Sequence, residues 1–183
     1  MGLRLKNPED VLRSRPGTQR RDLGLAAFRI AVASYWLYEQ HWKLPPDFGL
    51  RQPRGLMFAF QQGIQYPTLD IYKSFLETIV VPNFYLFGWL LFIAEVLIGL
   101  SLLLGLFTRA GAIMATIQAL NLLISQASTP EGLWIYLAIL LANLIVLLTP
   151  TNRQLSLDRV LAPTFAEQAS RGRRLARVAL ALM

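Results

Sequence analysis

The stretch Pro82–Gly111, PNFYLFGWLLFIAEVLIGLSLLLGLFTRAG, decides the fold. Its apolar run Phe84–Phe107 is long enough, at about 1.5 Å per residue, to cross a hydrocarbon core of roughly 30 Å, which predicts a transmembrane helix. One ionisable residue, Glu95, lies at the centre of this run. A carboxylate in hydrocarbon is costly unless it is protonated, paired or exposed to water. Glu95 is therefore expected to have a partner inside the protein.

The composition of the whole chain fits one small membrane bundle. Of its 183 residues, 54% are hydrophobic and only 16% are charged, which is too apolar for an ordinary soluble domain. The formal net charge of +7 comes from segments that flank the apolar runs, so nucleic acid is not an expected partner. The chain has no cysteine and one histidine, His41. This excludes disulfides, iron–sulfur clusters, thiol nucleophiles and c-type or bis-histidine haem held by one copy of the chain.

The expected fold is all-α, a polytopic four-helix membrane bundle. Its predicted spans are Leu23–Trp42, Phe84–Phe107, Ala110–Ala127 and Glu131–Leu148, within a bundle of residues 23–149 that lies between a basic leader (1–22) and a basic amphipathic tail (150–183). Thirteen lysines and arginines lie in the segments on one side of these spans and four lie on the other side. The positive-inside rule then places both termini in the cytoplasm, with the protein in the inner membrane of a bacterial cell.

The long connection between the first two spans is expected on the outer side, where it forms an amphipathic interfacial helix. Its apolar residues at helical spacing are Leu69, Tyr72, Phe75, Leu76 and Ile79. A loop of this length is often functional, and a lid with a purely structural role is the equal alternative. The tail is expected to form two short surface helices, one after Ser156 and one in RGRRLARVALALM, in contact with phospholipid.

Polar side chains inside the spans form a candidate site. Arg29 is the other strongly ionisable residue well inside an apolar span, so we expect it to pair with Glu95. The first span places Arg29, Ala33, Trp36, Gln40 and Lys43 on one stripe that faces the interior. The predicted buried site comprises Arg29, Trp36, Glu95, Asn121 and Asn143, and a second polar cluster at the outer mouth comprises Glu39, Gln40 and Lys43. The alternative is that Arg29 and Glu95 only join two helices, a contact worth about 1 kcal/mol.

Such a site suits the head group of a lipophilic molecule, such as a quinone, or a proton relay. The sequence contains no phosphate-binding loop, dinucleotide fingerprint, zinc-protease motif or nucleophile elbow. No metal and no intrinsic redox centre are expected. Electrons would therefore come from a bound cofactor or from another polypeptide.

Two blocks of residues resemble a known family. The pattern Arg29-x13-Lys43-Leu44, followed by Glu95-x3-Gly99-x5-Gly105-x3-Arg109, is similar to the DoxX family of four-span bacterial membrane proteins. Within that family, the DoxD-like small subunit of a quinone-linked thiosulfate oxidoreductase is similar in layout, and RQLSLDRVL after the last span fits the same group. The resemblance covers roughly residues 23–161. It implies a membrane subunit associated with oxidoreductases that pass electrons to the quinone pool.

Two functions stay open from the sequence. The first is a DoxX/DoxD-like membrane subunit of a quinone-linked oxidoreductase, and whether this chain is itself catalytic is open. The second is a non-catalytic accessory subunit that clamps or stabilises a larger membrane complex. A small transporter is less favoured because the spans show no inverted repeat with broken helices. Membrane lipid and other membrane subunits are the expected partners.

Overall fold

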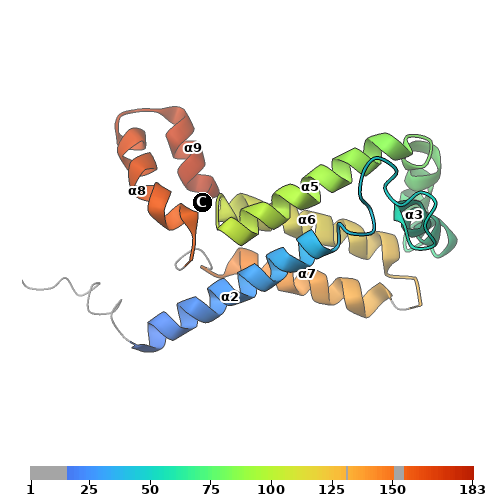
Figure 1. Cartoon of the computed structure of the whole chain (residues 1–183), viewed down its shortest axis with the longest axis horizontal. Coiled ribbons are helices and arrows are strands. Elements are labelled where there is room, and N and C mark those ends of the chain that lie inside the picture. The colour runs from blue at the N-terminus through green and yellow to red at the C-terminus, as the bar shows by residue number, and fades with distance from the viewer. Residues whose placement is uncertain (1–15, 131, 151–154) are drawn as a thin grey trace, which may run out of the picture.

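The computed structural model describes residues 16–130, 132–150 and 155–183, and these residues form helices and no strand (Figure 1). The long helices are α2 (Pro16–Tyr38), α5 (Phe84–Leu104), α6 (Thr108–Gln126) and α7 (Gly132–Leu148). The short ones are α3 (Leu56–Gln65), α4 (Asp70–Phe75), the π-helix η1 (Leu76–Val80), α8 (Leu157–Ser170) and α9 (Arg174–Leu182). The predicted all-helical fold is confirmed.

The helices at the four predicted spans have nearly the expected boundaries. The exception is α2, which begins at Pro16, inside the predicted leader, and ends at Tyr38, before the predicted end at Trp42. The rest of the predicted leader, residues 1–15, lies outside the described residues.

The long helices pack in the order α2, α5, α6 and α7, and α7 also contacts α2. Small residues permit the close approach of their backbones. A Cβ atom at Gly99 of α5 would lie 2.6 Å from the side chain of Leu37 on α2, so a larger residue there would force Leu37 to shift. On α6, the small side chains of Ala112, Ala115 and Ala119 are at most 1% exposed and belong to the same apolar core.

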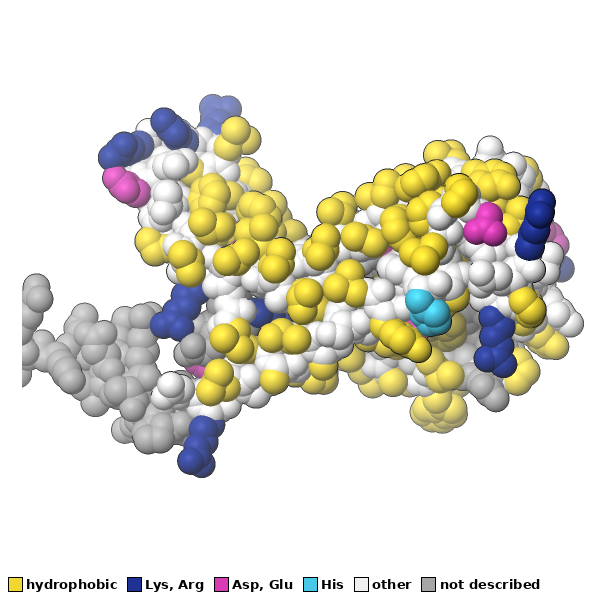
Figure 2. Space-filling model, in the orientation of Figure 1, with side chains coloured by type: hydrophobic (Ala, Val, Ile, Leu, Met, Phe, Trp, Pro, Cys, Tyr) yellow, Lys and Arg dark blue, Asp and Glu magenta, His cyan; other side chains and the backbone are white. Residues whose placement is uncertain are grey.

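The outer faces of α5 and α7 are apolar. The exposed side chains of α5 include Leu86, Leu90, Ile93, Leu97, Leu100 and Leu104, which recur every three or four residues. Figure 2 shows hydrophobic side chains gathered over α5 and over the α8–α9 hairpin. Of the helices that the structure describes, α5 has both the length and the hydropathy of a membrane span, and α7 is apolar but shorter.

The connection between α2 and α5 folds into a cap at one end of the bundle (Figure 1). Phe48, Leu56, Phe60, Leu76, Val80 and Phe84 form its buried core. The helix predicted in this connection is present as α4 and η1. However, Leu76 is the one buried member of its predicted apolar stripe, while Leu69, Phe75 and Ile79 are exposed. The sequence analysis did not predict α3.

The two predicted tail helices are confirmed as α8 and α9, which pack against each other as a hairpin at the opposite end from the cap (Figure 1). Asp158, in the first turn of α8, is 2% exposed and caps α6. Its carboxylate accepts hydrogen bonds from the backbone N–H groups of Phe107, at 2.7 Å, and Thr108, at 2.8 Å. Ser156 donates to the carbonyl oxygen of Gly105 at 2.7 Å. These bonds fix the start of α8 to the α5–α6 turn.

Candidate functional site

Glu95 is 1% exposed and lies where α5 meets α2 and α6. Its Oε2 forms an ion pair with Lys43 and accepts a hydrogen bond of 2.7 Å from Gln40 Nε2. Its Oε1 accepts a hydrogen bond of 3.0 Å from Gln118 Nε2. Both carboxylate oxygens therefore have a donor, and the opposite charge of Lys43 makes burial of the pair tolerable.

The predicted pairing of Arg29 with Glu95 is wrong. Arg29 is fully buried, as expected, but its Nη2 donates a hydrogen bond of 2.5 Å to the carbonyl oxygen of Leu155. Asp158 supplies the carboxylate that attracts its charge. Arg29 thus belongs to the end of the bundle that carries α8, away from Glu95.

The register between α2 and α5 explains this difference. Gly99 lies against the side chain of Leu37 and the carbonyl of Ala33. Because α2 and α5 run antiparallel, Glu95, one turn before Gly99 on α5, lies at the level of a residue one turn after Ala33 on α2. Arg29 lies one turn before Ala33. Two turns correspond to roughly 11 Å along the axis, which separates the two charges into different layers.

The structure divides the predicted outer-mouth cluster. Gln40 and Lys43 join Glu95, whereas Glu39 accepts a hydrogen bond of 3.0 Å from Trp42 Nε1. Lys43 Nζ also lies 4.7 Å from the centre of the Trp42 ring, which is within range of a cation–π contact. Of the predicted interior stripe, Arg29, Ala33 and Trp36 lie on α2 and are buried. Gln40 and Lys43 are also buried, but they lie in the non-helical segment after the end of α2 at Tyr38.

Hydrogen bonds between helices hold the remaining predicted site residues. Trp36 Nε1 donates to Asn143 Oδ1 at 3.1 Å, and the Tyr72 hydroxyl donates to Asn121 Oδ1 at 2.9 Å. Burial raises the pKa of Tyr72 above its ordinary value, although hydrogen bonds to Ser125 and Asn121 act in the opposite direction. Tyr72 is therefore a neutral hydrogen-bond donor at physiological pH, and it links α4 of the cap to α6.

A cavity of about 280 Å³, here called the Glu95 cavity, lies beside the ion pair. Its aromatic lining residues are Tyr35, Trp36, Trp42, Phe60, Tyr72 and Tyr136. Its polar lining residues are Glu39, Lys43, Glu95, Gln118, Asn121, Ser125 and Gln126. A concave site with aromatic walls and a few convergent polar groups is the usual form of a small-molecule site.

The cavity brings together Trp36, Glu95 and Asn121 of the predicted buried site, whereas Arg29 and Asn143 are not among its lining residues. The prediction missed Gln118 and Tyr72. Gln118 shares one helical face with Asn121, which is the signal that could have identified it. Among the residues that the structure describes, no group of three or more histidine, aspartate or glutamate side chains is placed to hold a metal ion.

Comparison with protein families matches residues 25–183 to the family described as TQO small subunit DoxD. Searches of curated proteins and of solved structures returned no match. The matched region contains every helix from α3 onward, the part of α2 from residue 25, and the whole of the Glu95 cavity. The predicted resemblance is confirmed, and the chain belongs to the DoxD family of TQO small subunits.

Proposed function

We propose that this protein is the membrane-embedded small subunit of a quinone-linked oxidoreductase and that it binds a quinone head group in the Glu95 cavity. Family membership supports the first part of this proposal, a small subunit that acts with other subunits. One observation supports the second part, the binding of a quinone head group: a buried Lys43–Glu95 ion pair forms part of the wall of a cavity of about 280 Å³ with aromatic sides.

The apolar exterior supports the membrane location. Exposed apolar side chains follow the outer faces of α5 and α7, and monomeric soluble proteins rarely expose large contiguous apolar patches. In the proposed arrangement α2, α5, α6 and α7 cross the bilayer of a bacterial inner membrane. The start of α2 and the α8–α9 hairpin lie at the same end of the molecule (Figure 1). Because these segments are rich in arginine, we assign that end to the cytoplasm.

The side chains of the Glu95 cavity match the chemistry of a quinone. A quinone has a flat ring, which can stack on the rings of Trp36 and Tyr136, and carbonyl oxygens, which accept hydrogen bonds. Lys43 can turn its ammonium group from Glu95 to such an oxygen, while Gln40 and Gln118 continue to donate to the carboxylate. A bound quinone supplies an acceptor for electrons that a partner subunit provides.

The alternative is a non-catalytic accessory subunit. The observation that favours it is the large apolar exterior, which offers contact area to other membrane subunits. On this alternative the ion pair only joins α5 to the segment that follows α2, and quinone affinity does not depend on Lys43.

Quinone binding to the full chain in lipid nanodiscs tests the proposal. Titration with decylubiquinone and with the decyl naphthoquinone can be followed by quenching of tryptophan fluorescence, since Trp36 and Trp42 line the cavity. We expect Lys43→Gln to weaken binding by on the order of tenfold, because it removes a charged hydrogen-bond donor worth about 1.5–3 kcal/mol.

The matched control is Lys73→Gln, which changes a lysine whose side chain is 39% exposed and lies outside the cavity lining. It should leave affinity unchanged. Equal affinity of the unaltered chain and a folded Lys43→Gln variant would contradict the quinone site and favour the accessory role.

A further inference from the structure

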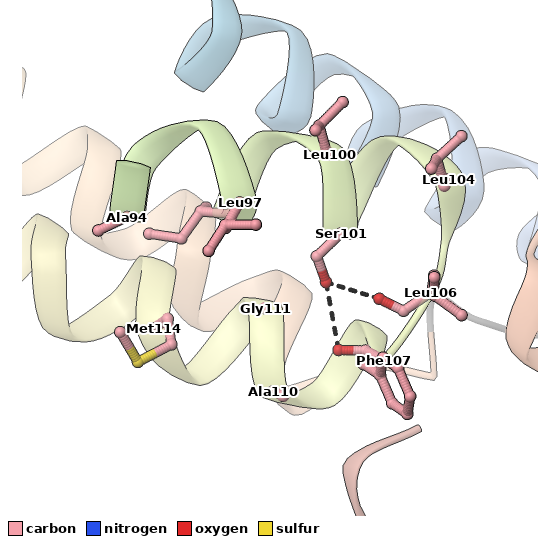
Figure 3. A pocket seen from close by; sticks show the side chains of 11 residues that line it. Ala94, Leu97, Leu100, Ser101, Leu104, Leu106, Phe107, Ala110, Gly111 and Met114 are labelled. Atoms are coloured by element: carbon pink, nitrogen blue, oxygen red, sulfur yellow. Dashed lines mark hydrogen bonds between the residues drawn. The ribbon is translucent and has the colours of Figure 1, made fainter. Parts of the chain in front are cut away.

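A second cavity, of about 450 Å³, lies between α5 and α6 and is here called the α5–α6 groove (Figure 3). Ser101 is the one residue with a polar side chain in its lining, and its hydroxyl already donates to the carbonyl oxygens of Leu106, at 2.7 Å, and Phe107, at 3.3 Å. The remaining side chains are apolar or absent, as at Gly111. The groove therefore offers hydrocarbon contact and leaves no lining side chain in need of a polar partner.

The groove and the Glu95 cavity follow one another along the same two helices. Ala94 lines the groove, and the next residue, Glu95, lines the cavity. On α6, Met114 lines the groove, and Gln118, one turn later, lines the cavity. At about 100° per residue, one stripe of α6 carries lining residues of both, namely Gly111, Met114, Gln118, Asn121 and Ser125.

The two sites have the chemical character that the two parts of one amphiphilic molecule require, a polar head group and a hydrocarbon tail. The Glu95 cavity has charged and amide groups between aromatic rings, whereas the groove has an apolar lining whose single hydroxyl is satisfied internally. The groove is rimmed by Leu97, Leu100 and Leu104, which are 42–61% exposed on the outer face of α5. It therefore opens toward the side of the molecule where lipid would lie.

We propose that the α5–α6 groove holds the hydrocarbon tail of the quinone whose head group occupies the Glu95 cavity. The tail passes between α5 and α6 at Ala94 and Met114, the groove residues that are nearest in sequence to Glu95 and Gln118 of the Glu95 cavity. The ligand class is thus a tailed quinone, and tail contacts contribute to affinity. This inference rests on the proposed function.

An acyl chain of a membrane phospholipid is the other hydrocarbon that would fit the groove. The position of the groove favours the quinone tail, because its lining reaches the neighbour of Glu95 and continues the α6 stripe of the polar cavity. A phospholipid would need its polar head at the membrane surface, so it would not place a polar group in the adjoining Glu95 cavity.

The test compares quinones with the same ring and different tails. Decylubiquinone and its tail-less parent benzoquinone, and the decyl naphthoquinone and menadione, are titrated into the full chain in nanodiscs. The groove is filled by Ala110→Phe and, independently, by Ala94→Leu, which both add side-chain volume to the lining. We expect each change to weaken binding of the decyl forms by on the order of tenfold, equivalent to about two buried methylene groups, and to leave the tail-less forms unchanged.

The matched control is Ala138→Phe, an exposed position on α7 outside both linings, which should change neither affinity. A preference for tailed quinones that persists in folded Ala110→Phe and Ala94→Leu variants would overturn the inference while leaving the proposed function intact. Loss of a co-purified phospholipid from these variants, with tail preference retained, would assign the groove to phospholipid. Failure of the unaltered chain to bind any of the four probes would overturn the proposed function itself.

Discussion

Glu95 and Lys43 form an ion pair whose side chains are 1% and 6% exposed. Removing one member leaves the other charge buried without its partner, which costs about 3–5 kcal/mol, whereas replacing both with apolar residues is often neutral. We expect Glu95→Leu to lower the free energy of unfolding by about 3 kcal/mol and Lys43→Met with Glu95→Leu to recover more than half of that loss. Denaturant unfolding in detergent measures both variants. A double variant as unstable as the sum of the single ones would contradict a coupled pair.

For single residues, the sequence predicts which side chains are buried but does not predict which partner each of them contacts. The helical period alone places Arg29 and Trp36 on the buried stripe of α2, and the structure agrees, whereas Lys43 is buried but follows the end of α2 at Tyr38. Which of these cations meets Glu95 depends on the register of α2 against α5. That register is set by the contact of Gly99 with Leu37, between residues far apart in the sequence, which periodicity does not encode.

At the scale of helices, Asp158 joins α8 to the start of α6. Its two carboxylate oxygens satisfy the backbone N–H groups of Phe107 and Thr108, so it acts as a cap that comes from another helix. We expect Asp158→Ala to lower the free energy of unfolding by at least about 1–2 kcal/mol, because a capping group is worth this much and buried Arg29 also loses the carboxylate that attracts its charge. The loss is measured by thermal unfolding followed by circular dichroism.

The control for Asp158 is Glu167→Ala in the same helix. Glu167 forms an ion pair with Arg171, but both side chains are more than 60% exposed, so its loss should cost less than about 1 kcal/mol. Equal effects of Asp158→Ala and Glu167→Ala would show that the cap contributes no more than a surface ion pair.

The helices differ in how far their sequences determine them. The apolar run of α5 is sufficient to predict it, and Ser156 followed by a helical pattern predicts α8. Helix α3, LMFAFQQGIQ, combines an apolar run with two adjacent glutamines and Gly63, and the glycine lowers its helix propensity. It is helical because Leu56 and Phe60 pack with Phe48 in the cap, a tertiary contact that local propensity does not contain.

At the scale of the whole molecule, buried charge is placed in two layers. Glu95 and Lys43 lie near the cap, and Arg29 and Asp158 lie near the α8–α9 hairpin. Apolar side chains and the Trp36–Asn143 hydrogen bond occupy the region between them. Within the proposed membrane arrangement, the first layer faces the outer side and the second faces the cytoplasm.

This orientation predicts which end of the molecule a reagent reaches from outside the cell. The chain has no cysteine, so an introduced thiol is the only one that a maleimide can label. Gln52, in the cap, and Thr164, in α8, are both exposed and lie at opposite ends of the molecule. We expect a membrane-impermeant maleimide to label Gln52→Cys in intact bacterial cells and Thr164→Cys only after lysis. The unaltered chain is the control. Labelling of Thr164→Cys in intact cells would contradict a cytoplasmic hairpin, because a charged reagent does not cross the hydrocarbon core that separates the two ends.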